Sequence, residues 1–225
     1  MLRAITYKDT ELKAPLIREE KPPALLYYDD TINEYSLKRG FDIVVAAFGI
    51  ATVLLWIYPV VWLLIKLSSP GKGLFVQKRT GYKGKTFNCY KFRTMVLNRD
   101  ADICQAQEED LRVTTIGKWM RRTHIDELPQ LINVLVGDMS IVGPRPHMLL
   151  HDSAFGATVP TYRQRSLLRP GITGLAQVMG YHGYIKDYKC IAMRTRLDLF
   201  YLKKNSLLLD VRIMLRTITT FLKLR

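Results

Sequence analysis

The sequence has few cysteines and lacks the cysteine patterns of disulfide-rich secreted proteins and of zinc-binding proteins. Its three cysteines, Cys89, Cys104 and Cys190, are odd in number and far apart, so they form neither a disulfide framework nor a zinc-binding spacing. This usage is typical of a reducing, cytoplasmic setting. His147 and His151 stand four residues apart, as in a metal pair, but no third ligand has matching spacing, which argues against zinc.

The start of the sequence also lacks the layout of a signal peptide. Residues 1–36 are polar and contain Pro15, Pro22 and Pro23, and the first apolar run comes later than a secretion signal requires. We find no internal repeat and no low-complexity tract. We expect residues 1–36 to form an N-terminal arm that is poorly ordered or loosely docked.

Acidic residues are scarce beyond the N-terminal arm. The chain of 225 residues has 34 basic and 20 acidic side chains and a net charge of +14. The whole excess follows Gly40, because the residues before it carry equal numbers of each sign. A basic body predicts an anionic partner, which could be nucleic acid, anionic lipid or a phosphorylated substrate. The length fits one domain, or one domain with an appendage.

One long apolar run, residues 41–67, dominates the first third of the chain. It has a single charge near each end, Asp42 and Lys66, and is long enough for a membrane helix. Pro59 should break or kink this helix, because proline removes a backbone hydrogen bond. Basic residues on both sides favour a cytoplasmic location for both ends. The pattern leaves a re-entrant hairpin and a straight membrane span open alike, with the core helix of a soluble protein as the least favoured reading.

Residues 123–146, THIDELPQLINVLVGDMSIVGPRP, contain the main candidate for chemistry. Asp126 and Glu127 stand at an expected helix start, with Thr123 as its N-cap. Arg145 lies between two prolines, whose fixed φ holds it in place, and a held guanidinium can grip phosphate with two donors. A carboxylate beside a phosphate clamp predicts phosphoryl chemistry. The alternative is that the acids only complement a helix dipole and that the proline-rich segment is a turn.

Two short strands are expected over residues 74–79 and 86–92, forming a β-hairpin. Lys91 and Arg93 occupy alternate positions, so they should share one face. That face could receive a diphosphate, or it could be a solvated edge.

The remaining pattern is helical, so the chain as a whole reads as α+β and mainly helical. Residues 116–122 form a short amphipathic stretch that brings Arg121 close to the acidic pair. Residues 196–204 contain Asp198 among apolar neighbours. Residues 206–225 form a basic amphipathic helix, which could lie in a membrane interface or cap the core.

Seven motifs in register resemble the bacterial sugar transferases, the monotopic polyprenol-phosphate phosphoglycosyl transferases. One motif is the proline-broken apolar segment. The others are KRGFD (38–42), FVQKRTG (75–81), YKFRTM (90–95), RRTHIDELPQLINVLVGDMSIVGPRP (121–146), RPGITGLAQV (169–178) and DLFYLKKNSLLLD (198–210).

The resemblance implies a re-entrant membrane helix over residues 37–68, broken at Pro59, which enters and leaves on the cytoplasmic face of the bacterial inner membrane. It implies a small cytosolic catalytic domain over residues 69–225. This domain would carry the short β-hairpin and interfacial amphipathic helices, the last of them at the C-terminus.

The resemblance also implies the reaction. A sugar 1-phosphate would pass from a UDP-sugar to undecaprenyl phosphate with release of UMP and with Mg²⁺, as the first membrane step of exopolysaccharide or O-antigen-type glycan synthesis. Asp126 would be the nucleophile that forms a phosphosugar intermediate, and Glu127 its partner in metal binding or positioning. Both carboxylates are candidate Mg²⁺ ligands.

Five further residues are candidates for the same site. Arg145 and Arg121, together with Lys91 and Arg93, would bind substrate phosphate. Asp198 falls at a position that the family associates with the active site, with a less definite role. A basic, phosphate-binding cavity agrees with the physical requirement that attack by an anion on an anionic diphosphate needs cations nearby.

The sugar is weakly encoded. The motifs resemble the undecaprenyl-phosphate glucose phosphotransferases, which favours glucose, with galactose or an N-acetylated sugar as the alternative. His124 replaces a usual serine, Tyr58 precedes the proline in place of a serine, and GYHGY (180–184) replaces a frequent GYRGE. These departures bear on the sugar more than on the reaction.

Two other functional classes are alternatives to the enzyme. The sequence does not determine whether the protein forms a homo-oligomer. A nucleic-acid binder is suggested by the net charge alone, but no binding motif is present and the apolar run argues against it. We therefore expect no nucleic-acid partner. A non-catalytic membrane scaffold would have no use for the acidic pair together with the Pro-Arg-Pro segment.

Overall fold

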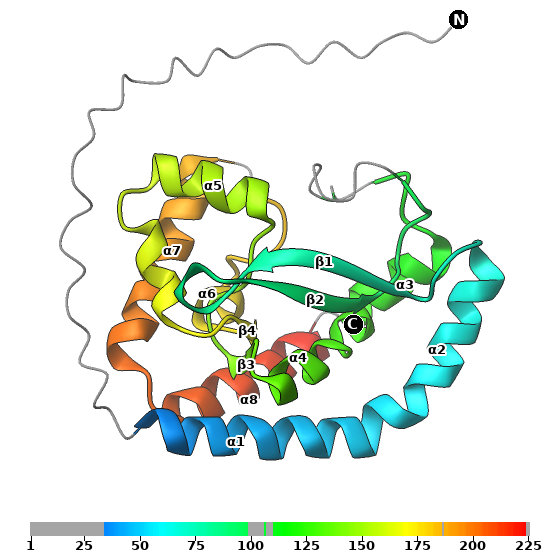
Figure 1. Ribbon diagram of the computed structural model, residues 1–225, viewed down its shortest axis with the longest axis horizontal. Helices are drawn as coiled ribbons and strands as arrows, with labels where there is room; N and C mark the ends of the chain where they lie inside the picture. The colour runs from blue at the N-terminus through cyan, green and yellow to red at the C-terminus, as the bar shows by residue number, and fades with distance from the viewer. Residues whose placement is uncertain (1–33, 99–105, 107–109, 186, 224–225) are drawn as a thin grey trace, which may run out of the picture. The chain divides into compact units, whose positions relative to one another are not determined.

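The computed structural model (Figure 1) describes residues 34–98, 106, 110–185 and 187–223, of which 34–36 and 221–223 are described only as backbone. The described residues belong to one compact unit. It is mainly helical with two small two-stranded sheets, as the α+β expectation requires. The expected N-terminal arm lies outside the described residues, except for its last three, which begin the first helix.

The apolar run forms one continuous helical segment. Helix α1 (Glu34–Gly49) passes through a π-helical turn (Ile50–Leu54) into α2 (Leu55–Ser68), and the segment bends between α1 and α2 (Figure 1). Pro59 lies inside α2, so the expected break at this residue is wrong in position. Pro59 cannot donate a hydrogen bond to the carbonyl four residues earlier. The bend lies instead at the π-helical turn, and widened π turns are a common cause of helix bends.

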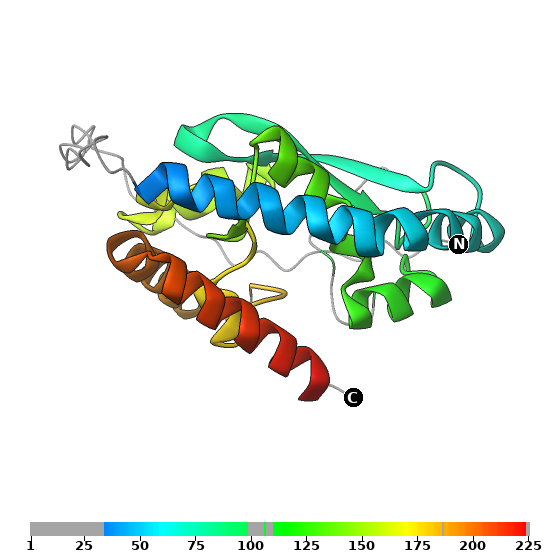
Figure 2. The same ribbon diagram turned by 90° about the horizontal axis from the view of Figure 1, so that it is seen from below.

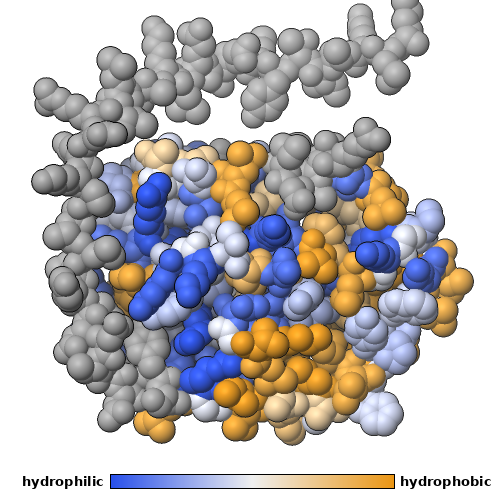
Figure 3. All heavy atoms as spheres, in the orientation of Figure 1, coloured by the Kyte–Doolittle hydropathy of each residue, from blue (hydrophilic) through white to orange (hydrophobic). Residues whose placement is uncertain are grey.

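This segment is not the core helix of a soluble protein. Over residues 37–68 it is long and apolar enough to cross a membrane, and only 11% of its most apolar window is buried. Large apolar side chains on it face outward, among them Phe48, Leu55, Trp56 and Leu67. Figure 3 shows hydrophobic residues gathered along the lower edge of the view, where α1 runs.

The elements after this segment, in chain order, are β1 (Leu74–Thr80), a 3₁₀ turn (Tyr82–Gly84), β2 (Thr86–Phe92), α3 (Thr115–Thr123), a 3₁₀ turn (Ile125–Glu127), α4 (Gln130–Val136), β3 (Ser140–Val142), α5 (Leu149–Thr158), a 3₁₀ segment (Tyr162–Leu167), β4 (Gly171–Thr173), α6 (Leu175–Val178), α7 (Tyr188–Lys204) and α8 (Leu207–Lys223). Strands β1 and β2 form the expected antiparallel hairpin. The parallel pair β3–β4 was not anticipated, because strands of three residues carry too little pattern to recognise.

The KRGFD motif anchors α1 to the rest of the protein. Lys38 Nζ lies 2.6 Å from Asp210 Oδ2 on α8. The Arg39 guanidinium donates to two carbonyls at the C-terminal end of α4, at 2.7 and 2.9 Å. Asp42 is buried and accepts a 3.0 Å hydrogen bond from the Ile141 N–H on β3. These four contacts fix the apolar segment against the elements that follow the acidic pair.

Two apolar clusters complete this docking. One contains Val134, Val142, Tyr201 and Ile213 and lies between α4, β3, α7 and α8. The other lies under α2 and packs it against β2 and α3. Helix α8 buries Ile213 but exposes Leu215, and Figure 2 shows α1 and α8 on the same face of the molecule. The expected amphipathic C-terminal helix is therefore present, with apolar residues on its outer side as well.

Candidate active site

The acidic pair lies between two helices rather than at the start of one. Helix α3 ends at Thr123, whose hydroxyl donates to the Trp119 and Met120 carbonyls, so the expected N-cap role for Thr123 is wrong. His124 then adopts a left-handed conformation, with φ of 54°, and terminates α3. Asp126 follows in a 3₁₀ turn before α4. A helix end followed by a tight turn has the same residue pattern as a helix start.

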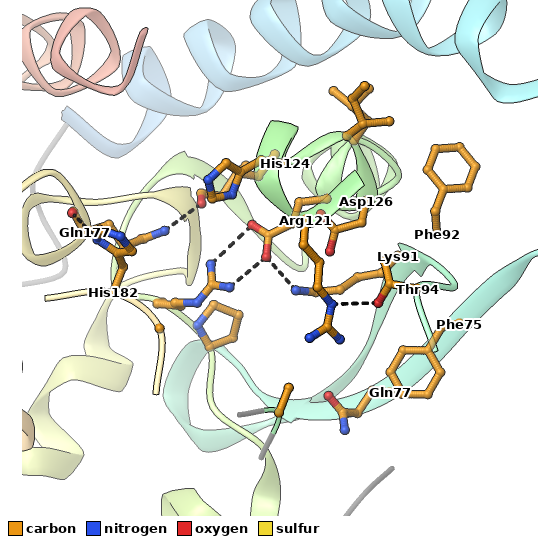
Figure 4. Close-up of a pocket in the computed structure, with 18 of the residues that line it drawn as sticks. Phe75, Gln77, Lys91, Phe92, Thr94, Arg121, His124, Asp126, Gln177 and His182 are labelled. Atoms are coloured by element: carbon orange, nitrogen blue, oxygen red, sulfur yellow. Dashed lines mark hydrogen bonds and ion pairs between the residues drawn. The ribbon is translucent and has the colours of Figure 1, made fainter. Parts of the chain in front are cut away.

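Glu127 is tied to two cations. Lys91 Nζ on β2 lies 2.6 Å from Glu127 Oε1. Arg145 donates from both terminal nitrogens, at 2.7 Å to Oε1 and 3.2 Å to Oε2. The dashed lines between the drawn side chains in Figure 4 mark these contacts. Burial alone would raise the pKa of Glu127, but Arg145 and Lys91 hold the pKa well below its usual range.

Asp126 is equally buried, at 8% exposure, but no described side chain donates a hydrogen bond to its carboxylate. Burial, with the negative charge of Glu127, raises the pKa of Asp126 to about 6, although Lys91, Arg121 and Arg145 oppose the rise. The pKa values of the two neighbouring carboxyls are therefore shifted in opposite directions. Such a pair assigns different roles to its members: one stays ionised and clamped, and the other remains available for reaction.

Arg121 approaches Asp126 from α3. Its Nε donates to Thr94 Oγ1 at 2.9 Å, which fixes the side chain beside the acidic pair. The pKa of Arg121 is lowered chiefly by burial, with Asp126 acting in the opposite direction. Figure 4 shows Arg121, Asp126 and Lys91 close together in the cavity. The structure thus brings five of the candidate residues to one place, namely Lys91, Arg121, Asp126, Glu127 and Arg145.

Arg93 lines the same cavity, but its guanidinium is engaged elsewhere. It donates to the Ser69 carbonyl at 2.7 Å and to the Pro70 carbonyl, both just after α2. Its expected face beside Lys91 exists, yet its hydrogen bonds secure the end of α2.

Asp198 does not line the cavity. It is buried on α7 and accepts from Arg165, with Nε at 2.9 Å and Nη2 at 2.8 Å from Oδ2. Arg165 Nη2 also donates to the Arg145 carbonyl at 2.7 Å. Asp198 therefore reaches the site through Arg165, a residue that no sequence motif singled out.

His147 is buried behind the Pro-Arg-Pro segment and is not arranged as a metal ligand. Its Nδ1 lies 2.6 Å from the Tyr162 hydroxyl, and its Nε2 lies 3.2 Å from Arg194 Nη1. Burial, followed by the charges of Arg165, Arg194 and other arginines, holds the pKa of His147 well below its usual range. The ring is therefore neutral.

One large cavity, with a volume of about 1080 Å³, is lined by all the candidate residues except Asp198. One part of its lining carries charged side chains, the acidic pair together with the basic Arg145 and Arg194. The other part is apolar and is formed by Phe92, Leu97, Trp119 and Leu128. A cavity with these two parts suits an amphipathic substrate pair better than a uniformly polar ligand.

The donor set fits a magnesium ion only in part. Both Glu127 oxygens are already occupied by cations, whereas the Asp126 carboxylate has no such partner. Within the described ranges, no group of three or more His, Cys, Asp or Glu side chains could hold a metal. Mg²⁺ commonly takes one or two carboxylates plus phosphate oxygens and water, so Asp126 together with a bound phosphate fits this ion.

Comparison with known proteins identifies one matching family and several similar proteins. A family model described as bacterial sugar transferase matches residues 33–224. The UDP-glucose:undecaprenyl-phosphate glucose-1-phosphate transferase of Caulobacter vibrioides is 45% identical over 186 residues, which cover 82% of this chain and 69% of that protein.

Two further relatives differ in their described roles. The UDP-N-acetylgalactosamine-undecaprenyl-phosphate N-acetylgalactosaminephosphotransferase of Aeromonas hydrophila is 43% identical over 83% of this chain, but the match covers only 44% of that protein. An exopolysaccharide production protein of Rhizobium leguminosarum is 42% identical over 80% of this chain and 94% of its own length.

Proposed function

The chain belongs to the bacterial sugar transferase family and is an enzyme of the polyprenol-phosphate phosphoglycosyl transferase class; on this premise, we propose that it transfers a sugar 1-phosphate from a UDP-sugar to undecaprenyl phosphate. The observation that carries the proposal is the inequality of the two adjacent carboxyls. Glu127 is clamped by Arg145 and Lys91, whereas Asp126 is unclamped at the same cavity wall.

In the first step, an Asp126 carboxylate oxygen attacks the phosphorus that bears the sugar. A bond forms between this oxygen and phosphorus, and the bond from phosphorus to the bridging oxygen of the diphosphate breaks. The electron pair of the broken bond stays on the bridging oxygen, which becomes a terminal oxygen of UMP. No proton transfer is needed, because the nucleophile is already ionised above its pKa of about 6.

In the second step, a phosphate oxygen of undecaprenyl phosphate attacks the same phosphorus. The bond to Asp126 breaks, which restores the carboxylate and releases undecaprenyl diphosphate sugar. Lys91, Arg121 and Arg145 face the phosphorus and reduce the repulsion between the anionic nucleophile and the anionic substrate. Arg93 supports the cavity wall through its carbonyl contacts rather than by binding phosphate.

Magnesium would be held by Asp126 together with substrate phosphate oxygens. When bound, it would neutralise charge on the transferring phosphate and on the departing UMP. We assign Glu127 to the positioning of Arg145 and Lys91 rather than to metal binding, because its oxygens already accept from both cations.

We place α1 and α2 in the cytoplasmic leaflet of the inner membrane as a re-entrant pair that bends at the π-helical turn. The exposed apolar side chains of this segment and its anchoring by the KRGFD motif support this location. With the catalytic elements packed directly on the segment, a lipid-linked phosphate can reach the cavity without its chain leaving the bilayer.

Glucose is the favoured sugar, because the Caulobacter relative is named for UDP-glucose. N-Acetylgalactosamine, named for the Aeromonas relative, is the alternative. The product would enter exopolysaccharide or O-antigen-type synthesis. Detergent-solubilised protein, incubated with undecaprenyl phosphate and a panel of UDP-sugars, should release UMP with one sugar preferentially.

The covalent step is tested by omitting the lipid acceptor. With UDP-sugar labelled in the sugar, the wild type should retain label on Asp126, located by peptide mass spectrometry. Asp126→Asn should retain none and should release no UMP. Asp187→Asn is the matched control, because Asp187 is an exposed helix cap whose role asparagine can fill. UMP release by Asp126→Asn would contradict the nucleophile assignment.

The topology is tested by labelling single cysteines at Thr10 and Lys72 in a variant that lacks the three native cysteines. Both should react only from the cytoplasmic side. Labelling of the two positions from opposite sides would contradict the re-entrant arrangement.

A further inference from the structure

The cations nearest the acidic pair are already committed to it. Arg145 and Lys91 both bind Glu127 at 2.6–2.7 Å, and Arg121 flanks Asp126. A UDP-sugar brings two phosphates, and only one of them is attacked. The second phosphate needs donors of its own within the same cavity.

Arg194 on α7 has the properties of such a donor. It is 2% exposed and lines the cavity. Its two terminal nitrogens meet only neutral acceptors at long distances, 3.2 Å to His147 Nε2 and 3.3 Å to the Gly183 carbonyl. Its Nε–H is buried and has no acceptor in the part of the chain that the structure describes. A buried guanidinium in this condition is costly unless an anion completes it.

Two neighbouring arginines, the buried Arg165 and the half-buried Arg79, have close acceptors that Arg194 lacks. Arg165 pairs with the Asp198 carboxylate at 2.8 Å. Arg79 donates to the Pro146 carbonyl at 2.6 Å and to Gln77 Oε1 at 2.9 Å. No described carboxylate lies within ion-pair distance of Arg194, so it combines a positive charge with an incomplete set of partners.

His147 fixes the orientation of Arg194 without adding charge. The ring lies between two arginines, with Nε2 at 3.2 Å from Arg194 Nη1 and Nδ1 at 3.3 Å from Arg165 Nη1, and Nδ1 is also 2.6 Å from the Tyr162 hydroxyl. Tyr162 in turn donates to Asp152 at 2.8 Å. This chain of hydrogen bonds leaves the Arg194 charge uncompensated beside Arg145, and burial and that arginine both lower the pKa of Arg194.

We propose that Arg194 binds the uridine-linked phosphate of the donor and stabilises its added negative charge as UMP departs. This inference rests on the proposed function. Helix α7 lies at the opposite end of the molecule from α2 (Figures 1 and 2). Phe92 on β2 lines the cavity and packs against α2, at the end of the molecule away from α7. The lipid phosphate therefore has a separate approach, and Arg194 is assigned to the nucleotide.

The test compares UMP with uridine, which lacks the phosphate, by calorimetric titration of the full-length protein in detergent. Arg194→Gln should weaken UMP binding about tenfold or more, in line with loss of a charge-assisted hydrogen bond, and leave uridine binding unchanged. Arg196→Gln is the matched control, because Arg196 is exposed on the same helix and does not line the cavity. It should bind UMP as the wild type does.

A purely structural role for Arg194 would weaken UMP and uridine alike, and this result would overturn the proposal. Arg194→Lys keeps the charge and provides a second variant if the glutamine variant does not fold; it should retain part of the preference for UMP over uridine. In turnover, Arg194→Gln should raise KM for UDP-sugar and leave KM for a short-chain polyprenyl phosphate unchanged. The reverse pattern would assign Arg194 to the acceptor and overturn the inference.

The proposed function and this inference fail in different ways. A wild type that binds no UMP and releases none from any UDP-sugar contradicts both. A wild type that turns over, with undiminished UMP binding in Arg194→Gln, contradicts only the role of Arg194.

Discussion

Arg145 binds both carboxylate oxygens of Glu127, at 2.7 and 3.2 Å, across 18 residues of sequence. This contact makes the two adjacent acids unequal. It holds Glu127 ionised and immobile and leaves the carboxylate of Asp126 without a hydrogen-bonding side chain among the described residues. The two acids are therefore not interchangeable: Glu127 is held by two cations, and Asp126 is the residue that we propose as the nucleophile.

The first prediction concerns the pH dependence of turnover. In the proposed mechanism Asp126 must be ionised to attack, and its pKa is raised to about 6, so kcat/KM should rise between pH 5 and pH 7 with an apparent pKa of about 6. Glu127→Gln removes a negative neighbour and releases two cations toward Asp126. Its profile should therefore move to lower pH, whatever its absolute rate. Coincident profiles for the two proteins would contradict this coupling.

The second prediction concerns stability. An acid whose pKa is higher in the folded state binds more protons there, so stability falls as pH rises from about 4 through about 6. At pH 7.5 the ionised, buried Asp126 should cost up to about 3 kcal/mol. Asp126→Asn should thus be inactive yet melt at a higher temperature than the wild type at pH 7.5, with the gap closing at pH 4. Asp187→Asn should show no such gain.

The third prediction concerns the anchor of α1. Asp42 is 2% exposed and accepts from the Ile141 N–H, so Asp42→Ala leaves a buried donor unsatisfied. We expect a loss of about 1–3 kcal/mol in the free energy of unfolding, measured by denaturation in detergent. Asp42→Asn keeps an acceptor oxygen and should lose less. Equal losses in the two variants would show that the charge, not the hydrogen bond, matters.

The fourth prediction concerns Asp198 as a positioning residue. Asp198→Leu leaves Arg165 as an unpaired buried charge and should cost about 3–5 kcal/mol of stability. The double variant Asp198→Leu with Arg165→Met should recover most of that stability, because both charges are gone. It should not recover kcat/KM, because the hydrogen bond from Arg165 to the Arg145 carbonyl is also lost. Recovery of both quantities would reduce Asp198 to a structural role.

The fifth prediction concerns magnesium. Chelation with EDTA should stop turnover, and added Mg²⁺ should restore it. If Asp126 alone supplies the protein ligand, Glu127→Gln should keep a similar Mg²⁺ concentration for half-maximal rate even though its rate is lower. A rise of ten times or more in that concentration would make Glu127 a metal ligand.

Local sequence patterns predicted the elements well where neighbours in the chain decide the outcome. The alternating residues around a glycine turn gave the β1–β2 hairpin, and the two prolines around Arg145 identified a held arginine. The same local reasoning was wrong for Thr123 and Pro59. A capping residue followed by an acid gives the same sequence pattern at a helix start and at a helix end. Helix α2 continues through Pro59, and the π-helical turn lies before it in the chain.

The sequence by itself determined the family, the long apolar helical segment and the identity of the acidic pair, because these are carried by residue types at short spacing. Only the tertiary structure decided which acid is held by cations and which is not, and that Asp198 contacts Arg165, which in turn contacts the Arg145 carbonyl. It also decided that Arg194 meets the cavity without a counter-ion. The reason is physical: ion pairs and burial depend on which distant segments pack together, and no local pattern contains that distance.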